Sequence, residues 1–107
     1  MCAFNVGVRD AMVASADEAA LCLRALSNPS RLLIVCNLLE GERSVSSLEN
    51  ELGLSQAYVS QQLARLRTEG IVSARREGRT VHYSISDQRI RPVVETLFSE
   101  FSSSQLD

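Results

Sequence analysis

The chain contains no lysine, and its eleven basic residues are all arginine. It has a single histidine, His82, and three cysteines, Cys2, Cys22 and Cys36, with no C-x-x-C pair. An odd cysteine count without paired spacing does not indicate a disulfide framework. No apolar run approaches the roughly 20 residues that span a bilayer, and the N-terminus lacks the basic head and apolar core of a secretory signal. These absences favour a cytosolic protein with no membrane partner.

Catalytic signatures are also missing. The sequence has no phosphate-binding loop, no G-x-S-x-G and no histidine that accompanies a nucleophile and an acidic orienter. Its carboxylates are scattered over predicted helix surfaces, where solvation alone explains them. We therefore expect a protein that is not an enzyme and that holds no cofactor.

The charges that are present are unevenly distributed. The net charge is −2, but residues 55–91 carry seven arginines against three acids, a net +4. Residues 1–54 and residues 92–107 each have a net charge of −3. A basic segment inside an acidic chain is typical of a phosphate-binding surface, and the alternative is a solvated surface of ion pairs. The helical and strand pattern of the same segment favours the phosphate-binding interpretation.

The length of 107 residues predicts one small domain without linkers or repeats, in which residues 1–9 are expected to be loose. Asn28-Pro29 suits the start of a helix, because Asn is a good N-cap and Pro fits the first helical position. The helix that follows, residues 29–40, is apolar nearly all round and is predicted to be the buried central helix. Before it, a first helix over residues 10–27 has an apolar stripe formed by Met12, Ala16, Ala19, Leu23 and Leu26.

Residues 44–70 predict a helix-turn-helix. Ser44 or Ser46 caps a short helix, Gly53 suits the left-handed turn after it, and Ser55 caps the next helix. Two helices joined by a short turn that contains Gly are typical of the motif whose second helix reads the major groove of DNA. The buried stripe of this second helix is predicted to be Val59, Leu63 and Leu66.

Gly70 ends the reading helix, and the next residues alternate as two strands, 71–76 and 79–85, joined by a tight turn at Glu77-Gly78. This hairpin predicts a wing, so that the fold is mainly α with a small β-hairpin, a winged helix-turn-helix. A final helix over residues 87–102 has an apolar stripe that is too large for the surface of a small monomer, and a second copy of the chain would cover it. The stripe consists of Val93, Val94, Leu97, Phe98 and Phe101.

Opposite its buried stripe, the predicted reading helix presents amide and guanidinium groups. Gln bonds adenine through two atoms, and Arg does the same with guanine. The start of the helix suits backbone phosphates, and arginines on the hairpin suit a minor groove or its phosphates. We therefore predict that double-stranded DNA contacts Ser55, Gln56, Ala57, Tyr58, Ser60, Gln61, Arg65, Arg75, Arg76 and Arg79.

Three runs in this region, SNPSRLLIVCNLL, LSQAYVSQQLARLRTEGIV and RREGRTVHYSIS, resemble the ArsR/SmtB group of bacterial winged-helix repressors. The resemblance covers roughly residues 17–102. It implies a homodimer formed by the first and last helices and a symmetric operator read by two reading helices about one DNA turn apart. It also implies repression in the absence of an inducer.

The metal sites of such repressors are altered here. Many relatives bind a metal through a C-x-C pair on the central helix, where this chain has Cys36 alone. Others bind zinc through Asp and His at the start of the last helix and His and Glu near its end. Asp87 is present, but Arg89, Glu100 and Ser103 stand at the other positions. Because an arginine cannot ligate zinc, we expect no metal site.

The chain is most similar to the thiol-based branch of the family, which responds to sulfide, persulfides or oxidants. That branch has one Cys on the central helix and a second after an aromatic residue near the end of the last helix. Cys36 fills the first position, and Ser102, which follows Phe101, stands at the second. Serine cannot form a sulfur bridge, so the chain is either a natural single-thiol variant or a Cys-to-Ser form of a dithiol sensor. The resemblance implies reactive sulfur species as the inducer and Cys36 as the sensing thiol.

Other interpretations stay open. Cys36 and Cys22 both suit small apolar core positions, Cys2 is assigned no role, and His82 suits a strand or a phosphate contact better than a metal site. A repressor that responds to arsenite or copper(I) requires the three thiols to converge. A winged helix that binds only protein would show no salt-sensitive binding to its own promoter.

Overall fold

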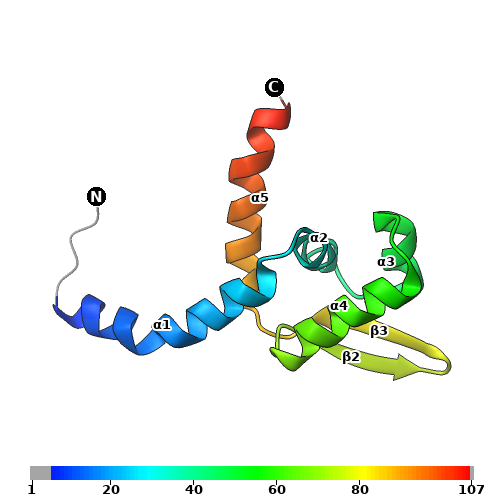
Figure 1. Ribbon diagram of the computed structural model, residues 1–107, viewed down its shortest axis with the longest axis horizontal. Helices are drawn as coiled ribbons and strands as arrows, with labels where there is room; N and C mark the ends of the chain where they lie inside the picture. Colours follow the sequence, from blue (N-terminus) through cyan, green and yellow to red (C-terminus); the bar gives the residue numbers. More distant parts are fainter. Residues whose placement is uncertain (1–5, 107) are drawn as a thin grey trace.

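The computed structural model describes residues 6–106 and shows a winged helix-turn-helix, mainly α with one small sheet, as the sequence predicts. Figure 1 shows a lobe formed by α2, α3, α4 and the hairpin, from which α1 and α5 project in different directions. The elements in chain order are α1 (Val6–Leu26), α2 (Pro29–Leu38), β1 (Arg43–Ser44), α3 (Val45–Leu52), α4 (Gln56–Thr68), β2 (Val72–Glu77), β3 (Thr80–Ile85) and α5 (Ile90–Leu106).

The helix starts follow the capping residues. Asn28, Ser44 and Ser55 each have extended backbone, and each side chain accepts a hydrogen bond from the backbone N–H three residues further on. Such a bond satisfies one of the N–H groups that have no partner inside the helix. Between α3 and α4, Gly53 adopts φ 66°, the left-handed conformation that glycine reaches without steric cost. These local signals fix where the two helices of the helix-turn-helix begin and end.

The wing differs from the prediction in two respects. Glu77 lies within β2 and pairs with Thr80, so the tight turn is Gly78-Arg79 and not Glu77-Gly78. The turn shifts because Gly78, with φ 64°, takes the first central position of the loop. The sheet also has a third strand, β1, in the order β1-β3-β2. Strand β1 has no signature in the sequence, because its two residues are too few to show alternation.

The core lies between α2, α3, α4 and the sheet. Along α4, Val59, Leu63 and Leu66 are fully buried, which confirms the predicted stripe. Their packing fixes the rotation of α4 about its axis and therefore decides which side chains face outward. The other buried apolar residues are Ala25, Leu26, Ile34, Val35, Leu38, Leu48, Ile71, Val72, Ile85, Ile90 and Val94.

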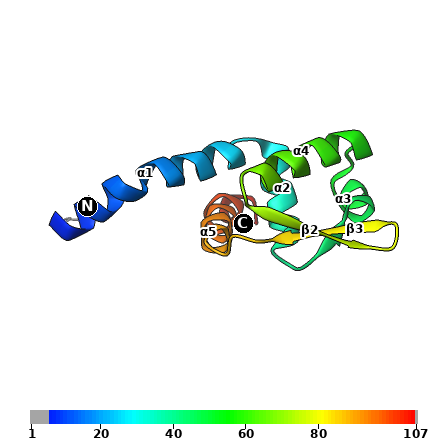
Figure 2. The same cartoon turned by 90° about the horizontal axis from the view of Figure 1, so that it is seen from below.

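The helices at the two ends of the chain bury only part of their apolar stripes within the single chain. Helix α1 begins at Val6, before the predicted start at residue 10, and only its last turn is buried. Figure 2 shows the rest of α1 extending away from the lobe. The prediction that α2 is the buried central helix is confirmed: Ile34, Val35 and Leu38 are buried, and α2 packs against α1, α3, α4 and α5, although Leu33 is 43% exposed. Within residues 6–106 no single helix has the length and hydropathy to cross a membrane; α1 and α2 pass that test only as a pair bent by 99°.

Candidate nucleic-acid interface

The outward face of α4 is built as the sequence analysis expects. Ala57, Gln61 and Arg65 are exposed on the side away from the buried stripe, and Thr68 continues that face. The Thr68 hydroxyl donates to the carbonyl of Ala64 at 2.9 Å, so it is engaged within the helix. The guanidinium of Arg65 lies 3.7 Å from the carboxylate of Glu69, an exposed contact that leaves its donors accessible.

The start of α4 supplies a second group of predicted contacts. Ser55, Gln56 and Ser60 are exposed, whereas Tyr58 is half-buried. The hydroxyl of Ser55 accepts the backbone N–H of Tyr58 at 3.2 Å, so the capping bond occupies one of the four N–H groups at this helix end. The remaining positive end of the helix dipole suits an anion such as a DNA phosphate.

The three hairpin arginines have different surroundings. Within residues 6–106, Arg76 and Arg79 make no ion pair, and Arg79 lies in the turn at the tip of the wing. Arg75 instead donates two hydrogen bonds to Glu42, at 3.1 and 2.7 Å, and lies 3.6 Å from Glu77. These bonds lower the pKa of Glu42 and raise that of Arg75. The carboxylate of Glu42 therefore competes with DNA for Arg75, which is predicted to contact DNA.

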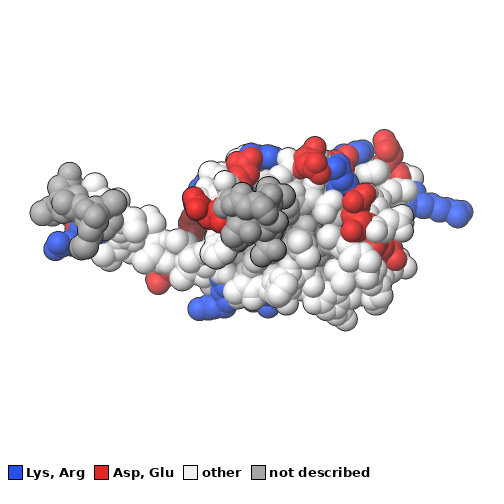
Figure 3. Space-filling model, turned by 90° about the horizontal axis from the view of Figure 1, so that it is seen from above, with Lys and Arg blue, Asp and Glu red and all other residues white. Residues whose placement is uncertain are grey.

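Acidic side chains lie beside this surface, at Glu42, Glu69 and Glu77, and also on the face from which α5 rises (Figure 3). In Figure 1, α4 and the hairpin occupy the lower part of the molecule, and α5 rises from the opposite side. Figure 3 shows that opposite side, where acidic side chains lie over the lobe with several arginines among them.

The predicted sensing positions lie on two helices that pack together, α2 and α5. Cys36 is half-buried against the core, and burial and the negative charge of Glu40 both raise the pKa of its thiol. Ser102 is half-buried near the end of α5, and no hydrogen bond joins it to Cys36 in the part of the chain that is described. Cys22 is also half-buried, with its pKa raised by burial, and Cys2 lies outside the described residues.

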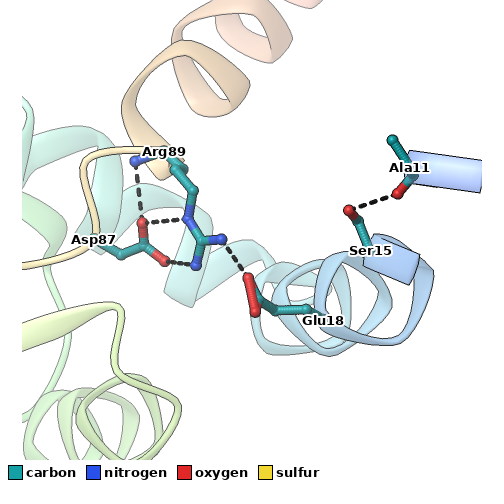
Figure 4. Close-up of polar contacts among 5 residues, drawn as sticks. All are labelled: Ala11, Ser15, Glu18, Asp87 and Arg89. Atoms are coloured by element: carbon teal, nitrogen blue, oxygen red, sulfur yellow. Dashed lines mark hydrogen bonds and ion pairs between the residues drawn. The ribbon is translucent and has the colours of Figure 1, made fainter. Parts of the chain in front are cut away.

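The start of α5 is held by an arginine where the family's zinc site has a ligand. Figure 4 shows the Arg89 guanidinium between Asp87 and Glu18. It donates to both carboxylate oxygens of Asp87, at 2.9 and 2.8 Å, and also binds Glu18 of α1. Glu18, Asp87 and Arg89 line a cavity of about 410 Å³ between α1 and α5, and Cys22 lies in its wall. The Asp87 carboxylate is thus neutralised by a side chain of the same chain.

Sequence reasoning missed Glu42 as part of this surface. Glu42 precedes β1 and lies 33 residues before Arg75, so no local pattern links the two. The short strand β1 pairs with β3 at Ser44 and His82, which brings the segment before it beside the wing. Only that pairing makes the contact with Arg75 possible.

Comparisons with known proteins agree with this geometry. The model of the bacterial regulatory protein, arsR family, matches residues 28–74. The biofilm growth-associated repressor of Xylella fastidiosa is 39% identical over 97 residues, which cover 91% of this chain and 85% of that protein. The crystal structure of the repressor BigR from Xylella fastidiosa superposes with a TM-score of 0.83 at 41% identity and covers 87% of this chain and 95% of that one.

A solution structure gives a further match. The homodimeric winged helix-turn-helix DNA-binding domain Mb0332 of Mycobacterium bovis superposes with a TM-score of 0.72 at 29% identity, over 99% of this chain and 94% of that one. The fold, with its exposed helix α4, is that of the winged helix-turn-helix regulators of transcription. The chain belongs to the arsR family of bacterial regulatory proteins.

Proposed function

We propose that the chain is a dimeric repressor that binds double-stranded operator DNA through α4 and the tip of the wing. The observation that carries this proposal is the exposed face of α4, where Gln61 and Arg65 lie opposite a fully buried stripe. Gln and Arg are the side chains that read adenine and guanine in the major groove. Ser55, Gln56, Ala57, Tyr58 and Ser60 surround them, and Arg76 and Arg79 extend the contact from the hairpin.

A second copy of the chain fits the exposed apolar residues of the outer helices. Met12, Val13 and Leu23 of α1 are 57%, 72% and 56% exposed, and Val93 of α5 is also exposed. Large apolar side chains that share two neighbouring helices favour an interface, because their burial removes apolar surface from water. The homodimeric state of the similar Mb0332 domain supports this assignment. Sedimentation velocity at micromolar concentration should show a dimer, and Val13→Glu should shift it toward monomer.

The DNA-binding proposal is tested by fluorescence anisotropy with a duplex from the region upstream of the chain's own gene. Gln61→Ala and Arg65→Ala should each reduce discrimination against an unrelated duplex, by a factor that corresponds to about 1–3 kcal/mol. Arg67→Ala is the matched control, because Arg67 is exposed on the same helix but lies outside the predicted reading face. Binding that is absent at low salt, or that loses no affinity with added salt, would contradict the proposal and favour a protein-binding winged helix.

We also propose that reactive sulfur species modify Cys36. The thiolate of Cys36 attacks the outer sulfur of a persulfide R–S–S–H, the S–S bond breaks, and the thiol R–SH leaves with the proton that Cys36 lost. Cys36 then carries a persulfide. Because Ser102 has no sulfur, this persulfide cannot be resolved into an intrachain bridge. The modified chain should therefore keep its affinity for DNA.

Mass spectrometry tests the sensing proposal. Treatment with an organic persulfide should add one sulfur atom to the wild-type chain, and Cys36→Ser should abolish that addition while Cys22→Ser should not. Arsenite and mercuric ion are a second arm of the experiment, since the relatives include a probable mercury resistance operon repressor of Streptomyces lividans. Stoichiometric metal adducts with no sulfur addition would replace the sulfur proposal by a metal-responsive one.

A further inference from the structure

Arg31, in the first turn of α2, contacts two other helices at once. Its Nε donates to the carbonyl oxygen of Ala25 at 2.5 Å, and its Nη1 donates to Oε1 of Gln62 at 2.9 Å. Both bonds are partly buried. The Ala25 carbonyl is one of the last four of α1, which have no partner inside that helix. One guanidinium therefore hydrogen-bonds a carbonyl group at the end of α1 and a side chain in the middle of α4.

Arg31 contacts α1 at its last turn, which is also the turn that attaches α1 to the lobe. Ala25 and Leu26 are buried, whereas residues 7–21 are exposed throughout. At 1.5 Å per residue the helix is roughly 30 Å long. A rotation of about 10° at its last turn would move its far end by roughly 5 Å. The contacts of the last turn consequently decide the direction in which α1 projects.

The other end of the contact lies on the reading helix. Gln62 follows Gln61 directly, and within residues 6–106 it is the one α4 side chain that a hydrogen bond joins to another helix. The remaining side-chain bonds of α4 run inside the helix or to its cap. A change in the direction of α1 can therefore reach α4 through this guanidinium, as long as both of its bonds hold.

We infer that Arg31 is a positioning residue that sets the orientation of the reading helix relative to α1, and hence the spacing of the two reading helices in a dimer. This inference rests on the proposed function, in which α1 belongs to the dimer interface and α4 reads DNA. Arg31 itself is half-buried on α2 and takes no part in the predicted DNA contacts. Arg31 acts on the spacing of the two reading helices, so its loss should change the selectivity of the protein for the distance between two half-sites.

The experiment compares wild type, Arg31→Gln, Gln62→Ala and the double variant. The first probe is the duplex segment upstream of the chain's own gene that the bound protein protects from cleavage. The second is the same duplex with one base pair inserted between its half-sites, and the third is a duplex with one half-site. We expect the wild type to lose at least tenfold in affinity on the insertion, and each single variant to lose threefold or less. The double variant should behave like either single variant, because both remove the same contact.

Matched controls separate this role from charge and from stability. Arg24→Gln removes an arginine from the last turn of α1 that has no ion pair in the described chain, and it should discriminate between the spacings as the wild type does. Arg31→Lys keeps the charge but cannot form the planar two-way contact, so it should lose spacing selectivity as Arg31→Gln does, and it takes the place of Arg31→Gln if that variant does not fold. Unchanged spacing selectivity in Arg31→Lys and Gln62→Ala would overturn the inference. A wild-type chain that ignores all three probes would instead overturn the proposed function.

Discussion

Glu42 holds Arg75 across the wing through two hydrogen bonds, of 3.1 and 2.7 Å. The two residues flank β3, since Arg75 lies on β2 opposite His82 and Glu42 precedes β1 on the other side. Glu77 approaches both Arg75, at 3.6 Å, and His82, at 3.7 Å. This face of the sheet is consequently internally neutralised, while the turn with Arg79 is not.

The hairpin arginines should therefore contribute unequally to DNA binding. Arg79→Gln should weaken binding to all sequences and make the log–log salt dependence shallower by about one. Arg75→Gln should change that slope by much less, because its charge is already paired with Glu42. Glu42→Gln should release Arg75 and steepen the slope. Anisotropy titrations over a range of salt concentrations measure all three, and equal slopes for Arg75→Gln and Arg79→Gln would contradict the assignment.

Acidification should weaken the attachment of α5. The hydrogen bonds from Arg89 hold the pKa of Asp87 below its usual range. A carboxyl with a lowered pKa in the folded state stabilises the fold above its unfolded pKa of about 4 and loses that contribution as the pH falls through the folded value. Arg89→Gln should thus destabilise the chain near neutral pH more than at pH 2.

Urea unfolding at low ionic strength, over roughly pH 2–7, measures this difference, since salt screens exposed pairs. The effect is expected to be small because the Arg89 side chain is 72% exposed. Arg67→Gln, which removes an exposed arginine without an ion pair in the described chain, corrects for net charge. A destabilisation by Arg89→Gln that does not change with pH would show that Asp87 is not the linked group.

Truncating a buried side chain of α4 should lower the free energy of unfolding. Leu63 is fully buried on α4, so Leu63→Ala should lower the free energy of unfolding by about 2–5 kcal/mol. Leu33→Ala removes the same atoms from a 43% exposed position and should cost about 1 kcal/mol or less. Denaturant titrations of both variants provide the comparison. Similar losses at the two positions would mean that α2 is covered more fully than the single chain shows.

Introducing a sulfur atom at position 102 should complete the proposed switch. In Ser102→Cys, the new thiolate at position 102 should attack the inner sulfur of the persulfide on Cys36, so that its S–S bond breaks, the outer sulfur leaves as hydrogen sulfide, and a disulfide ties α2 to α5. We expect persulfide treatment to lower its affinity for DNA by about tenfold or more, whereas the wild type should stay within about twofold. Mass spectrometry with and without reductant identifies the bridge. The variant Cys36→Ser with Ser102→Cys is the control, and a treated wild type that releases DNA as strongly as Ser102→Cys would refute the need for a second thiol.

The amino-acid sequence by itself determined the helices of the lobe and the side of α4 that faces outward. Asn28, Ser44 and Ser55 act on backbone groups only a few residues away, so their effect can be read from local spacing. The stripe of Val59, Leu63 and Leu66 repeats with the helical period, and its burial leaves Gln61 and Arg65 outside by geometry alone.

Only the tertiary structure decided which arginines are free and which are engaged. Arg31 meets Gln62, Arg75 meets Glu42 and Arg89 meets Glu18 across separations of 31, 33 and 71 residues. Such pairs depend on how helices and strands pack, because no period or motif relates residues that lie on different elements. For the same reason, only its pairing with β3 defines the two-residue strand β1. That strand brings Glu42 to the wing.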